Sequence, residues 1–380
     1  MVIWRKNEIM IRLSKSAIGK EEIEAVKDVL EREYLGMGKD VERFEKELEE
    51  FIGRPVVCVN TGTAALHLAC QAIDLKSGDE VLVQSLTFLA TFQAISASGA
   101  IPVPCEVDPA TLTLDLCDAE KKLTKKTKAI MLVHYSGGCG NIESYYNFAQ
   151  RNNLRVIEDA AHAFGSTYKN KRIGSFGDVV CFSFDGIKNI TSGEGGAITS
   201  ADGKLLERIK DLRLLGVVND TYKRFSGERS WEFDVVEQGW RYHMSNIMAA
   251  IGRIQLKRFP EFKNKRQELA KKYRALFGEI PGVKTLELDY SAVVPHIFVV
   301  LVPKDIRNEI SSHLNNIGIQ TGRHYKPNHL LSYYKGGEYL LQKTEEIFDK
   351  LITLPLHPEL TDQQVHYIVN EVEKYIQSIP

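Results

Sequence analysis

Short apolar runs alternate with amphipathic stretches over residues 56–200. An apolar run bounded by turn residues is typical of a buried strand, and apolar positions at i, i+3 and i+4 are typical of a helix that covers a sheet. The alternation therefore predicts a mainly parallel sheet with crossover helices on its faces. The predicted strands are 56–59, 80–84, 102–107, 129–134, 155–159, 178–184 and 197–199, and the clearest helices between them are 63–73, 87–97 and 142–152.

The pattern changes after about residue 250. A long charged helix is predicted over 253–277, followed by a turn at Pro281 and Gly282, a strand over 296–302 and two further helical patterns. This is the pattern of a smaller α+β domain. We expect an α/β protein with a seven-stranded sheet in a large domain, residues 1–250, and a small C-terminal domain, residues 251–380. Because no repeat or Ser/Gly linker separates them, the two should pack together.

Composition excludes several classes of protein. Lys and Arg total 49 against 50 for Asp and Glu, so the net charge of −1 provides no global field for nucleic acid or an anionic membrane. The six cysteines form no Cys-x-x-Cys pair, which argues against a zinc site and a disulfide scaffold and favours a reducing compartment. No stretch approaches the roughly 20 apolar residues of a membrane span. We therefore expect a cytoplasmic protein without a metal site.

The first segment that carries chemistry is CVNTGTAALHLAC, residues 58–70. A predicted strand ends at Asn60, and an Ala/Leu-rich helix begins directly after Thr61-Gly62-Thr63. The N-terminus of a helix presents unpaired N–H groups, and a glycine there lets a phosphate approach the backbone closely. The segment is a candidate phosphate site; the alternative is an ordinary turn in which a threonine caps the helix.

The second segment is RVIEDAAHAFGS, residues 155–166. A β-branched strand carries Glu158 and Asp159 at its carboxyl end, where open α/β sheets bind their ligands. Apolar neighbours raise the pKa of a carboxylate unless a cation or hydrogen-bond donors keep it ionised, so a partner for Asp159 is expected. The alternative is a carboxylate that caps a neighbouring helix. His162 can contact the same ligand, although a lone histidine is also common as an ordinary core or surface residue.

The third segment is DVVCFSFDGIKNITSGEGGAITS, residues 178–200. A predicted strand reaches Ser183, a short connection carries Lys188, and the Gly-rich turn 193–196 leads into the next strand. A lysine held between buried strands beside an acidic group can lose its proton near neutral pH and act as a nucleophilic amine. The alternative, a solvated lysine, fits poorly with so short a turn between apolar flanks.

The fourth segment is EQGWRYHMSNIMAAIGRIQL, residues 237–256, an aromatic and basic loop that leads into a helix starting near Ser245. Arg241 can bind a phosphate or a carboxylate through its guanidinium group. It can equally stack on Trp240 or Tyr242 as an interface residue.

In this order and at these spacings, NTGTAALHLA, SLTFLAT, EDAAHAFGS and SFDGIKNITSGEGG resemble the DegT/DnrJ/EryC1/StrS family of pyridoxal-phosphate-dependent aminotransferases. The resemblance extends from IRLSKSAIGKEEIEAVKDVL to GIQTGRHYKPNHL near residue 320. It implies the aspartate-aminotransferase fold (fold type I), with pyridoxal 5′-phosphate as cofactor and pyridoxamine phosphate as its other form. It also implies a homodimer with active sites at the interface.

The resemblance assigns roles to single residues. Lys188 would carry the cofactor covalently on its amine, and Asp159 would pair with its pyridine nitrogen. The phosphate would bind at Gly62, Thr63 and Ser183. Two more residues complete the implied cofactor site: Phe88, in SLTF, where the family stacks an aromatic ring on the pyridine, and His162, where a Gln or His lies near the phenolic oxygen.

Two positions depart from the family pattern. The family usually carries Gly-Tyr-Asn-Tyr-Arg, whose Asn reaches the phosphate bound in the neighbouring subunit, whereas this chain has Gly-Trp-Arg-Tyr-His at 239–243. Arg241 can replace that Asn with a charge-assisted contact, which leaves its role across the interface open. Many relatives also have His at the position of Asp185, and this difference can bear on substrate choice.

The implied reaction moves an amino group from L-glutamate to a nucleotide-linked keto-sugar. The turn 191–196, Thr-Ser-Gly-Glu-Gly-Gly, resembles the branch that acts on 4-keto-6-deoxyhexoses and gives 4-amino-4,6-dideoxy sugars, whereas relatives acting at C3 tend to read Gly-Asp-Gly-Gly. Candidate sugar-nucleotide contacts are 35–37, Glu194, His324, Tyr325 and His329, although histidines on a loop are also common as plain surface residues.

Three alternatives are considered. Relatives that act as dehydratases have His at the position of Lys188, so the sequence opposes that reaction. An aminocyclitol aminotransferase, or a sugar aminotransferase acting at C3, can be told apart from the C4 enzyme only by testing substrates. A non-catalytic, ligand-sensing relative would be free to lose Lys188 or Asp159, and this chain keeps both.

Overall fold

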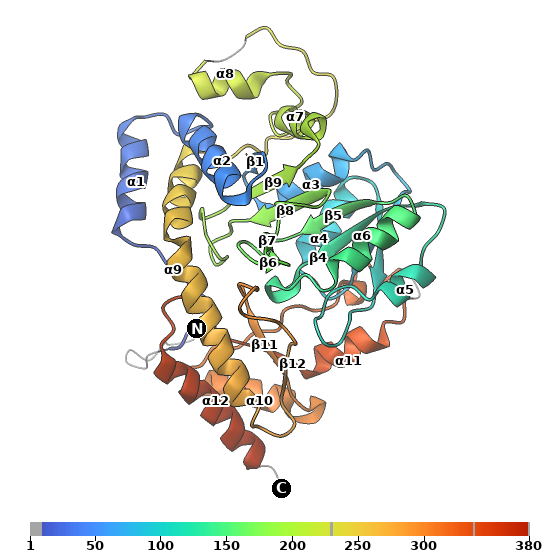
Figure 1. Ribbon diagram of the computed structural model, residues 1–380, viewed down its shortest axis with the longest axis vertical. Coiled ribbons are helices and arrows are strands. Elements are labelled where there is room, and N and C mark those ends of the chain that lie inside the picture. Colours follow the sequence, from blue (N-terminus) through green and yellow to red (C-terminus); the bar gives the residue numbers. More distant parts are fainter. Residues whose placement is uncertain (1–9, 229–230, 337–338, 379–380) are drawn as a thin grey trace.

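The computed structural model describes residues 10–228, 231–336 and 339–378 (Figure 1). Its central sheet has seven strands in the order β1-β9-β8-β5-β4-β2-β3, which confirms the predicted fold class. β9 is antiparallel to both β1 and β8, and the other neighbouring pairs are parallel. The strands are β1 Val56–Val59, β2 Glu80–Gln84, β3 Ile101–Cys105, β4 Thr127–Val133, β5 Arg155–Asp159, β8 Val179–Ser183 and β9 Gly196–Ser200.

Each strand of this sheet lies within two residues of its prediction. Two strands differ by two residues at one end: β4 begins at Thr127 rather than at residue 129, and β3 ends at Cys105 rather than at residue 107. The pairing of β3 with β2 explains where β3 ends, because β2 ends at Gln84, opposite Cys105. Sequence pattern marks where apolar residues occur, whereas the neighbouring strand decides where pairing stops.

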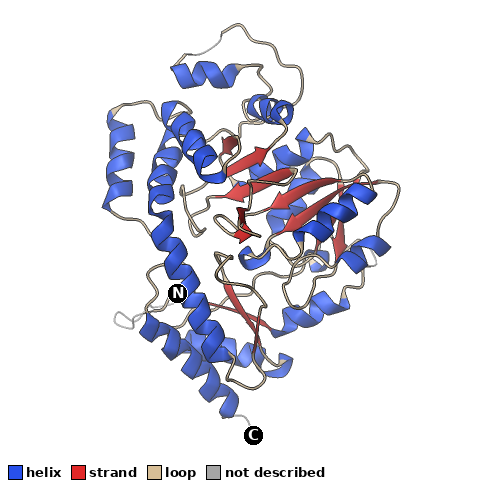
Figure 2. Cartoon of the chain, in the orientation of Figure 1, coloured by secondary structure: helices blue, strands red, loops and turns tan. Residues whose placement is uncertain are grey.

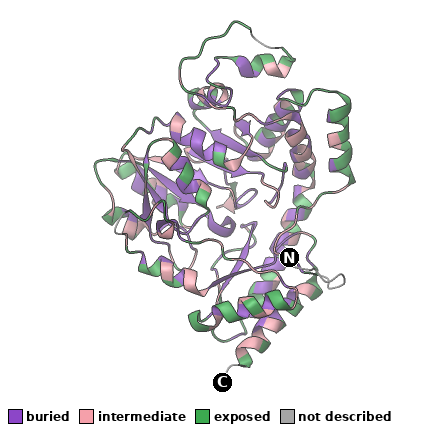
Figure 3. Ribbon diagram, turned by 180° about the vertical axis from the view of Figure 1, so that it is seen from behind, coloured by how far each residue is buried: buried purple, intermediate pink, exposed green. Residues whose placement is uncertain are grey.

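Helices cover both faces of the sheet, and the strands between them are almost entirely buried (Figures 2 and 3). α3 packs on one face, where its Ala and Leu side chains contact β8, β9 and β5. The helices of this part are α1 Lys20–Glu31, α2 Lys39–Ile52, α3 Gly62–Ala72, α4 Leu89–Ala97, α5 Leu116–Lys121, α6 Ile142–Arg151, α7 Gly203–Leu212 and α8 Asp220–Ser226. A two-stranded hairpin, β6 Thr167–Tyr168 and β7 Lys171–Arg172, lies beside them.

A single helix of 32 residues, α9 Asn246–Phe277, joins the two parts of the molecule. It begins where the Ser245 hydroxyl accepts a hydrogen bond from the Met248 N–H, which confirms the helix start predicted near Ser245. The charged stretch from residue 253 continues this helix rather than beginning a new one. In Figure 1, α9 runs from α1 and α2 down to α12. The predicted division at residue 250 falls inside this continuous helix and stays a prediction.

The C-terminal part is a three-stranded antiparallel sheet with helices, as expected for an α+β fold. Its elements are β10 Lys284–Thr285, β11 Phe298–Leu301, α10 Lys304–Asn316, the 3₁₀ turn η2 Asn328–Leu330, α11 Gln342–Lys350, β12 Leu351–Leu354 and α12 Asp362–Gln377. The prediction of two helices after the strand was wrong, because three α-helices follow β11. The nine-residue α11 is too short to give a strong helical pattern.

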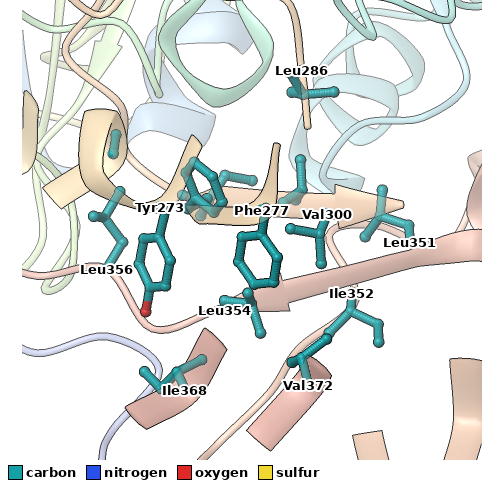
Figure 4. Close-up of a cluster of buried hydrophobic side chains, with 14 of the residues drawn as sticks. Tyr273, Phe277, Leu286, Val300, Leu351, Ile352, Leu354, Leu356, Ile368 and Val372 are labelled. Atoms are coloured by element: carbon teal, nitrogen blue, oxygen red, sulfur yellow. The ribbon is translucent and has the colours of Figure 1, made fainter. Parts of the chain in front are cut away.

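The core of this part is shared with α9 (Figure 4). Tyr273 and Phe277 of α9 stack against Phe298 of β11, with ring centroids 4.7 and 6.4 Å away. Ile368 and Val372 of α12 close the other side. Because α9 packs against α1 and α2 at one end and against β10 and α12 at the other, it joins the C-terminal part to the part that holds the central sheet.

Two backbone contacts tie the C-terminal part to earlier segments of the chain. Ile11 pairs in parallel with Ile319, so the N-terminal segment lies against the C-terminal part. The Asn328 N–H donates to the Ser85 carbonyl across 2.9 Å, which holds η2 against the end of β2. In the stretches of chain that the structure describes, no helix has both the length and the apolar character needed to cross a membrane.

Candidate active site

A cavity of about 560 Å³ opens at the carboxyl ends of β5 and β8, beside the N-terminus of α3. Ten of the twelve site residues predicted from sequence line it, among residues from both parts of the chain. They are Gly62, Thr63, Phe88, Asp159, His162, Ser183, Lys188, Glu194, His324 and Tyr325. The topology explains this convergence, because the carboxyl ends of parallel strands meet at one edge of a sheet.

We call Gly62, Thr63 and Ser183 the phosphate cradle. α3 begins at Gly62, and Thr61 caps it, because the Thr61 hydroxyl accepts a hydrogen bond from the Ala64 N–H. The first N–H groups of the helix, which line the cavity, have no intrahelical partners. A Cβ atom on Gly62 would lie 2.8 Å from the Ser183 Cβ. Only glycine therefore lets α3 approach the end of β8 this closely, and the cradle depends on that approach.

Asp159, the last residue of β5, is almost completely buried. Its Oδ2 accepts from the Thr91 hydroxyl across 2.8 Å, and its Oδ1 accepts from the Ala161 N–H across 3.2 Å. Burial raises the pKa of the carboxyl group, while these two donors and the charges of Lys188 and His134 oppose the rise. A cationic N–H that enters the cavity would find here a buried anion with unused acceptor capacity.

Lys188 lies in the connection between β8 and β9, and its side chain lines the cavity. Burial lowers the pKa of its amine to about 8; the carboxylates of Asp185 and Asp159 oppose this shift and the charge of Arg266 adds to it. The side-chain Nζ lies 3.4 Å from Nε2 of His296. An amine with this pKa is partly neutral near physiological pH and can act as a nucleophile or a base.

His162, Tyr325 and Phe88 form one wall of the cavity. Nε2 of His162 lies 3.1 Å from the Tyr325 hydroxyl, and the Tyr325 ring lies 5.4 Å from the Phe88 ring. Burial and the nearby charge of Lys188 lower the pKa of His162 well below its usual value, so the ring is neutral. Phe88 is 54% exposed rather than part of the core, so its ring is free to stack on a ligand.

Glu194 and His324 lie at the rim. Burial and the neighbouring Asp185 raise the pKa of Glu194. Nδ1 of His324 lies 2.9 Å from the Thr353 hydroxyl, and burial together with the charge of Lys188 lowers its pKa to about 4. Both side chains line the cavity. His324 is a neutral imidazole near physiological pH.

The other predicted contacts do not line this cavity. Arg241 is exposed and pairs through its backbone with Leu214, at the outer edge beside β1. His329 is buried in η2, where its ring nitrogens lie 2.7 Å from the Ser85 hydroxyl and 3.1 Å from the Glu345 carboxylate. Residues 35–37 lie at the start of α9 instead, where the Leu35 carbonyl accepts from the Asn246 N–H.

Sequence reasoning missed two residues that hold the site. Thr91 was given no role of its own, yet it hydrogen-bonds Asp159. Two signals were available: Thr91 ends the SLTFLAT motif, and it follows Thr87 by four residues, one helical turn. His296 was read as the start of a strand, and no motif marks it, because it comes from the C-terminal part and contacts Lys188 only in the folded protein.

These residues fit pyridoxal phosphate. The cradle offers backbone N–H groups to a phosphate, the buried Asp159 offers an anion to a protonated ring nitrogen, and Lys188 offers an amine to an aldehyde. In addition, Nδ1 of His162 is buried without a hydrogen-bond partner among the described residues, as expected for a group that awaits a ligand.

Comparison with known proteins agrees with this fit. Residues 16–373 match the model of the DegT/DnrJ/EryC1/StrS aminotransferase family. The chain is 35% identical, over 97% of its length and 97% of the relative, to a dTDP-4-dehydro-2,3,6-trideoxy-D-glucose 4-aminotransferase of Saccharopolyspora spinosa.

Two solved structures are similar to the whole chain. The aminotransferase TlmJ of Streptoalloteichus hindustanus has a TM-score of 0.90 and 31% identity, covering 98% of this chain and all of that one. A putative sugar aminotransferase of Streptococcus pneumoniae, Spr1654, in its PLP form has a TM-score of 0.89 and 29% identity, covering 98% and 100%. The chain belongs to the DegT/DnrJ/EryC1/StrS aminotransferase family and is a PLP-dependent transaminase.

Proposed function

We propose that this enzyme transfers an amino group from L-glutamate to a nucleotide-linked 4-keto-6-deoxyhexose, giving the 4-amino-4,6-dideoxy sugar. The observation that carries the proposal is the convergence of the Lys188 amine and the buried Asp159 carboxylate on one cavity. A transaminase needs both groups on the same cofactor.

When bound, pyridoxal phosphate supplies the electron sink that takes up the electron pair left when a substrate carbon loses its proton. The protein's residues supply the rest. Asp159, held by Thr91 and the Ala161 N–H, would keep a proton on the pyridine nitrogen of the bound cofactor. Lys188, with a pKa of about 8, is partly neutral at pH 7 to 8 and can take the substrate proton on Nζ.

The remaining cavity residues would orient the bound cofactor and enclose it. The cradle fixes the phosphate through backbone N–H groups and the Ser183 hydroxyl. Phe88 offers a ring face, and His162, neutral at physiological pH, offers its ring to the phenolic oxygen. Tyr325 and His324 cover the site from the C-terminal part, which limits the access of water during proton transfer.

Two observations support a ketone at C4 of the sugar. The turn 191–196 reads Thr-Ser-Gly-Glu-Gly-Gly, which resembles the branch of the family that acts at C4. The relative from Saccharopolyspora spinosa is named as a 4-aminotransferase of a dTDP-linked 4-keto sugar. Glu194, at the rim of the cavity, is the residue of this turn that would contact the sugar.

The enzyme is proposed to act as a homodimer. A phosphate brings two negative charges, yet the basic side chains among the residues lining the cavity are Lys188, His162 and His324, and the cradle itself contributes none. Arg241 is exposed outside the cavity of its own chain, so its guanidinium is available to the cradle of a second copy. That contact would be a charge-assisted hydrogen bond.

The decisive experiment is a spectral titration. Enzyme in the pyridoxamine form is mixed with a panel of nucleotide-linked 4-keto and 3-keto sugars that differ in nucleotide, and the return of the pyridoxal spectrum is followed. We expect 4-keto-6-deoxyhexoses to restore it fully. Conversion by 3-keto sugars alone, or by a cyclic ketone without a nucleotide, would overturn the proposed substrate while leaving the transaminase chemistry intact.

The donor is tested separately. The pyridoxal form is mixed with L-glutamate, L-glutamine, L-aspartate and L-alanine, and the loss of its spectrum is followed. L-Glutamate should react with the highest kcat/KM, and a faster reaction of another amino acid would replace it as donor. The Lys188→Ala protein serves as the control that should not turn over.

A further inference from the structure

His296 is a buried residue that none of the roles above uses. It lies two residues before β11, in the C-terminal part, and is 3% exposed. Its Nε2 lies 3.4 Å from Nζ of Lys188, which comes from the β8–β9 connection of the central sheet. Because 108 residues separate the two in sequence, their contact exists only through the packing of the two parts.

The backbone on both sides of this contact is fixed. The Asn189 amide donates to the Val294 carbonyl across 3.1 Å and to the Phe164 carbonyl across 3.1 Å, which ties the residue after Lys188 to the segment that carries His296. Arg266 of α9 donates to the His296 carbonyl across 3.1 Å. Two side chains thus set the distance between the amine and the imidazole.

The surroundings of His296 keep its ring neutral. The His162 ring packs against it in a tilted arrangement with ring centroids 4.6 Å apart, and the charged groups near it are Lys188 and Arg266, with the imidazole of His324 also nearby. Burial, followed by these charges, lowers the pKa of His296 well below its usual value. A neutral imidazole has one nitrogen that accepts a hydrogen bond and one that donates.

The other ring nitrogen of His296 makes no fixed contact. Its Nδ1 is buried without a hydrogen-bond partner among the described residues. In most buried histidines a partner on one nitrogen fixes which tautomer is present. Here no such partner fixes the tautomer, so Nε2 is free to present its lone pair to the Lys188 amine.

We propose that His296 is a positioning residue that accepts a hydrogen bond from the Lys188 amine whenever this amine is not bonded to the cofactor. Transamination frees the amine in every cycle. A free lysine side chain, with about four rotatable bonds, would otherwise sample many rotamers. His296 holds Nζ at one place, near the carboxylates of Asp159 and Asp185, whose charges raise the pKa of this amine. The inference rests on the proposed function only in taking Lys188 as the residue that is released.

The test measures Lys188 directly rather than turnover. Protein reconstituted with pyridoxamine phosphate, in which the amine is free, is treated with an amine-selective acylating reagent across pH 6 to 10, and labelling of Lys188 is quantified by peptide mass spectrometry. For the wild type we expect a midpoint near the lysine pKa of about 8. In His296→Phe the ammonium loses its acceptor, so the midpoint should fall by about one pH unit.

Two further variants separate positioning from packing. His296→Gln keeps an acceptor and should restore most of the wild-type midpoint. His357→Phe is the matched control, because His357 is also buried, also has an unpartnered Nδ1 and also lies near Arg266, yet it has no contact with Lys188 in the described chain. An unchanged midpoint in His296→Phe, or an equal shift in His357→Phe, would overturn the proposal.

A reciprocal measurement does not require the His296 variants to fold. In Lys188→Met protein labelled with ¹⁵N-histidine, the ring nitrogens of His296 should shift, because their partner is gone, while those of His357 should stay. A His296 signal identical to that of the wild type would refute the contact. Neither readout depends on the sugar substrate, so failure of the proposed substrate would leave both interpretable.

Discussion

The two groups of residues that would bind the cofactor differ in the side chains and charges that support them. Asp159 and Lys188, which we call the carboxylate–amine centre, are supported by side chains of the same chain: Thr91 for the carboxylate and His296 for the amine. The phosphate cradle consists of a helix N-terminus, the hydroxyls of Thr63 and Ser183, and no cation. One centre is complete within the subunit, whereas the other has a charge deficit for its ligand.

The difference indicates which of the two would use a second subunit in the proposed homodimer. Proton transfer requires an amine and a carboxylate placed to within fractions of an ångström, which is best achieved by groups fixed in one chain. A phosphate tolerates a looser cradle, because backbone N–H groups and a distant positive charge act over longer range. We therefore expect mutations in the first centre to affect the reaction itself and mutations in the cradle to affect cofactor binding.

The largest effect is expected for Lys188→Ala. Removing the amine removes both the covalent attachment and the base, so turnover should fall by at least about 10⁴-fold. The rate with saturating donor and acceptor is the measurement, and the absorbance spectrum of the protein with added cofactor shows whether the cofactor still binds. Turnover at the wild-type rate would remove Lys188 from the mechanism.

Next in size is Asp159→Ala. The loss of the anion that stabilises the ring-nitrogen proton should slow the half-reaction with L-glutamate on the order of 10³-fold, as for the loss of other main electrostatic partners. Rapid mixing of the pyridoxal form with the amino donor measures this rate. Asp159→Asn is the matched control, because it keeps the shape and the Thr91 contact but removes the charge, and it should be nearly as slow. A fast Asn variant would show that only the shape matters.

Gly62→Ala tests the cradle. The new Cβ would meet the Ser183 Cβ at 2.8 Å and push α3 away from β8, so cofactor binding should weaken by about 100-fold at most, through one to three kcal/mol of overpacking. Equilibrium dialysis of the cofactor measures this. Gly203→Ala is the control, because Gly203 also opens a helix, α7, and its Cβ would meet open space. Equal effects of both substitutions would mean that the close approach is unimportant.

Arg241→Ala should have a smaller effect, about 10-fold on the cofactor dissociation constant, because one charge-assisted hydrogen bond at a solvent-accessible site is lost. Mixed dimers identify the subunit that it serves. A dimer of one Arg241→Ala chain and one Lys188→Ala chain contains one fully intact site if Arg241 acts across the interface. It contains none if Arg241 acts within its own subunit. If the active site of the mixed dimer binds the cofactor about 10-fold more weakly than the wild type, the contact across the interface is refuted, and light scattering that finds only monomer would refute the dimer.

The smallest effect concerns stability. Burial lowers the pKa of Lys188 from 10.5 to about 8 in the folded protein, so between these values the unfolded chain binds more protons. The cost of burying the charged amine is fully present below about pH 8 and is relieved as the pH rises from 8 toward 10.5. Cofactor-free Lys188→Met should therefore be more stable to urea than the wild type at pH 7, and the difference should shrink at pH 10. If the difference in stability between Lys188→Met and the wild type grew with pH, it would contradict the lowered pKa of the buried Lys188 amine.

Much of the site was predictable because it sits where strands end. Asp159, Ser183 and Lys188 lie at or just after the carboxyl ends of β5 and β8, and a strand followed by a polar motif is visible in the sequence. His329 shows the limit of that reasoning. It was expected near the substrate, and it lies in η2, where it instead joins Ser85 to Glu345. A histidine on a loop gives no sequence signal of which way the loop turns.

The amino-acid sequence by itself determined the strand and helix pattern, the parallel sheet and the motifs at its edge, because these depend on local periodicity and on turn residues that the chain carries in order. Only the tertiary structure decided that Thr91 supports Asp159, that His296 from the C-terminal part meets Lys188, and that Arg241 does not line the cavity of its own chain. The physical reason is that each of these contacts depends on the relative placement of separately formed elements. α9 and the two sheets set that placement by packing, over sequence separations at which no local pattern carries information.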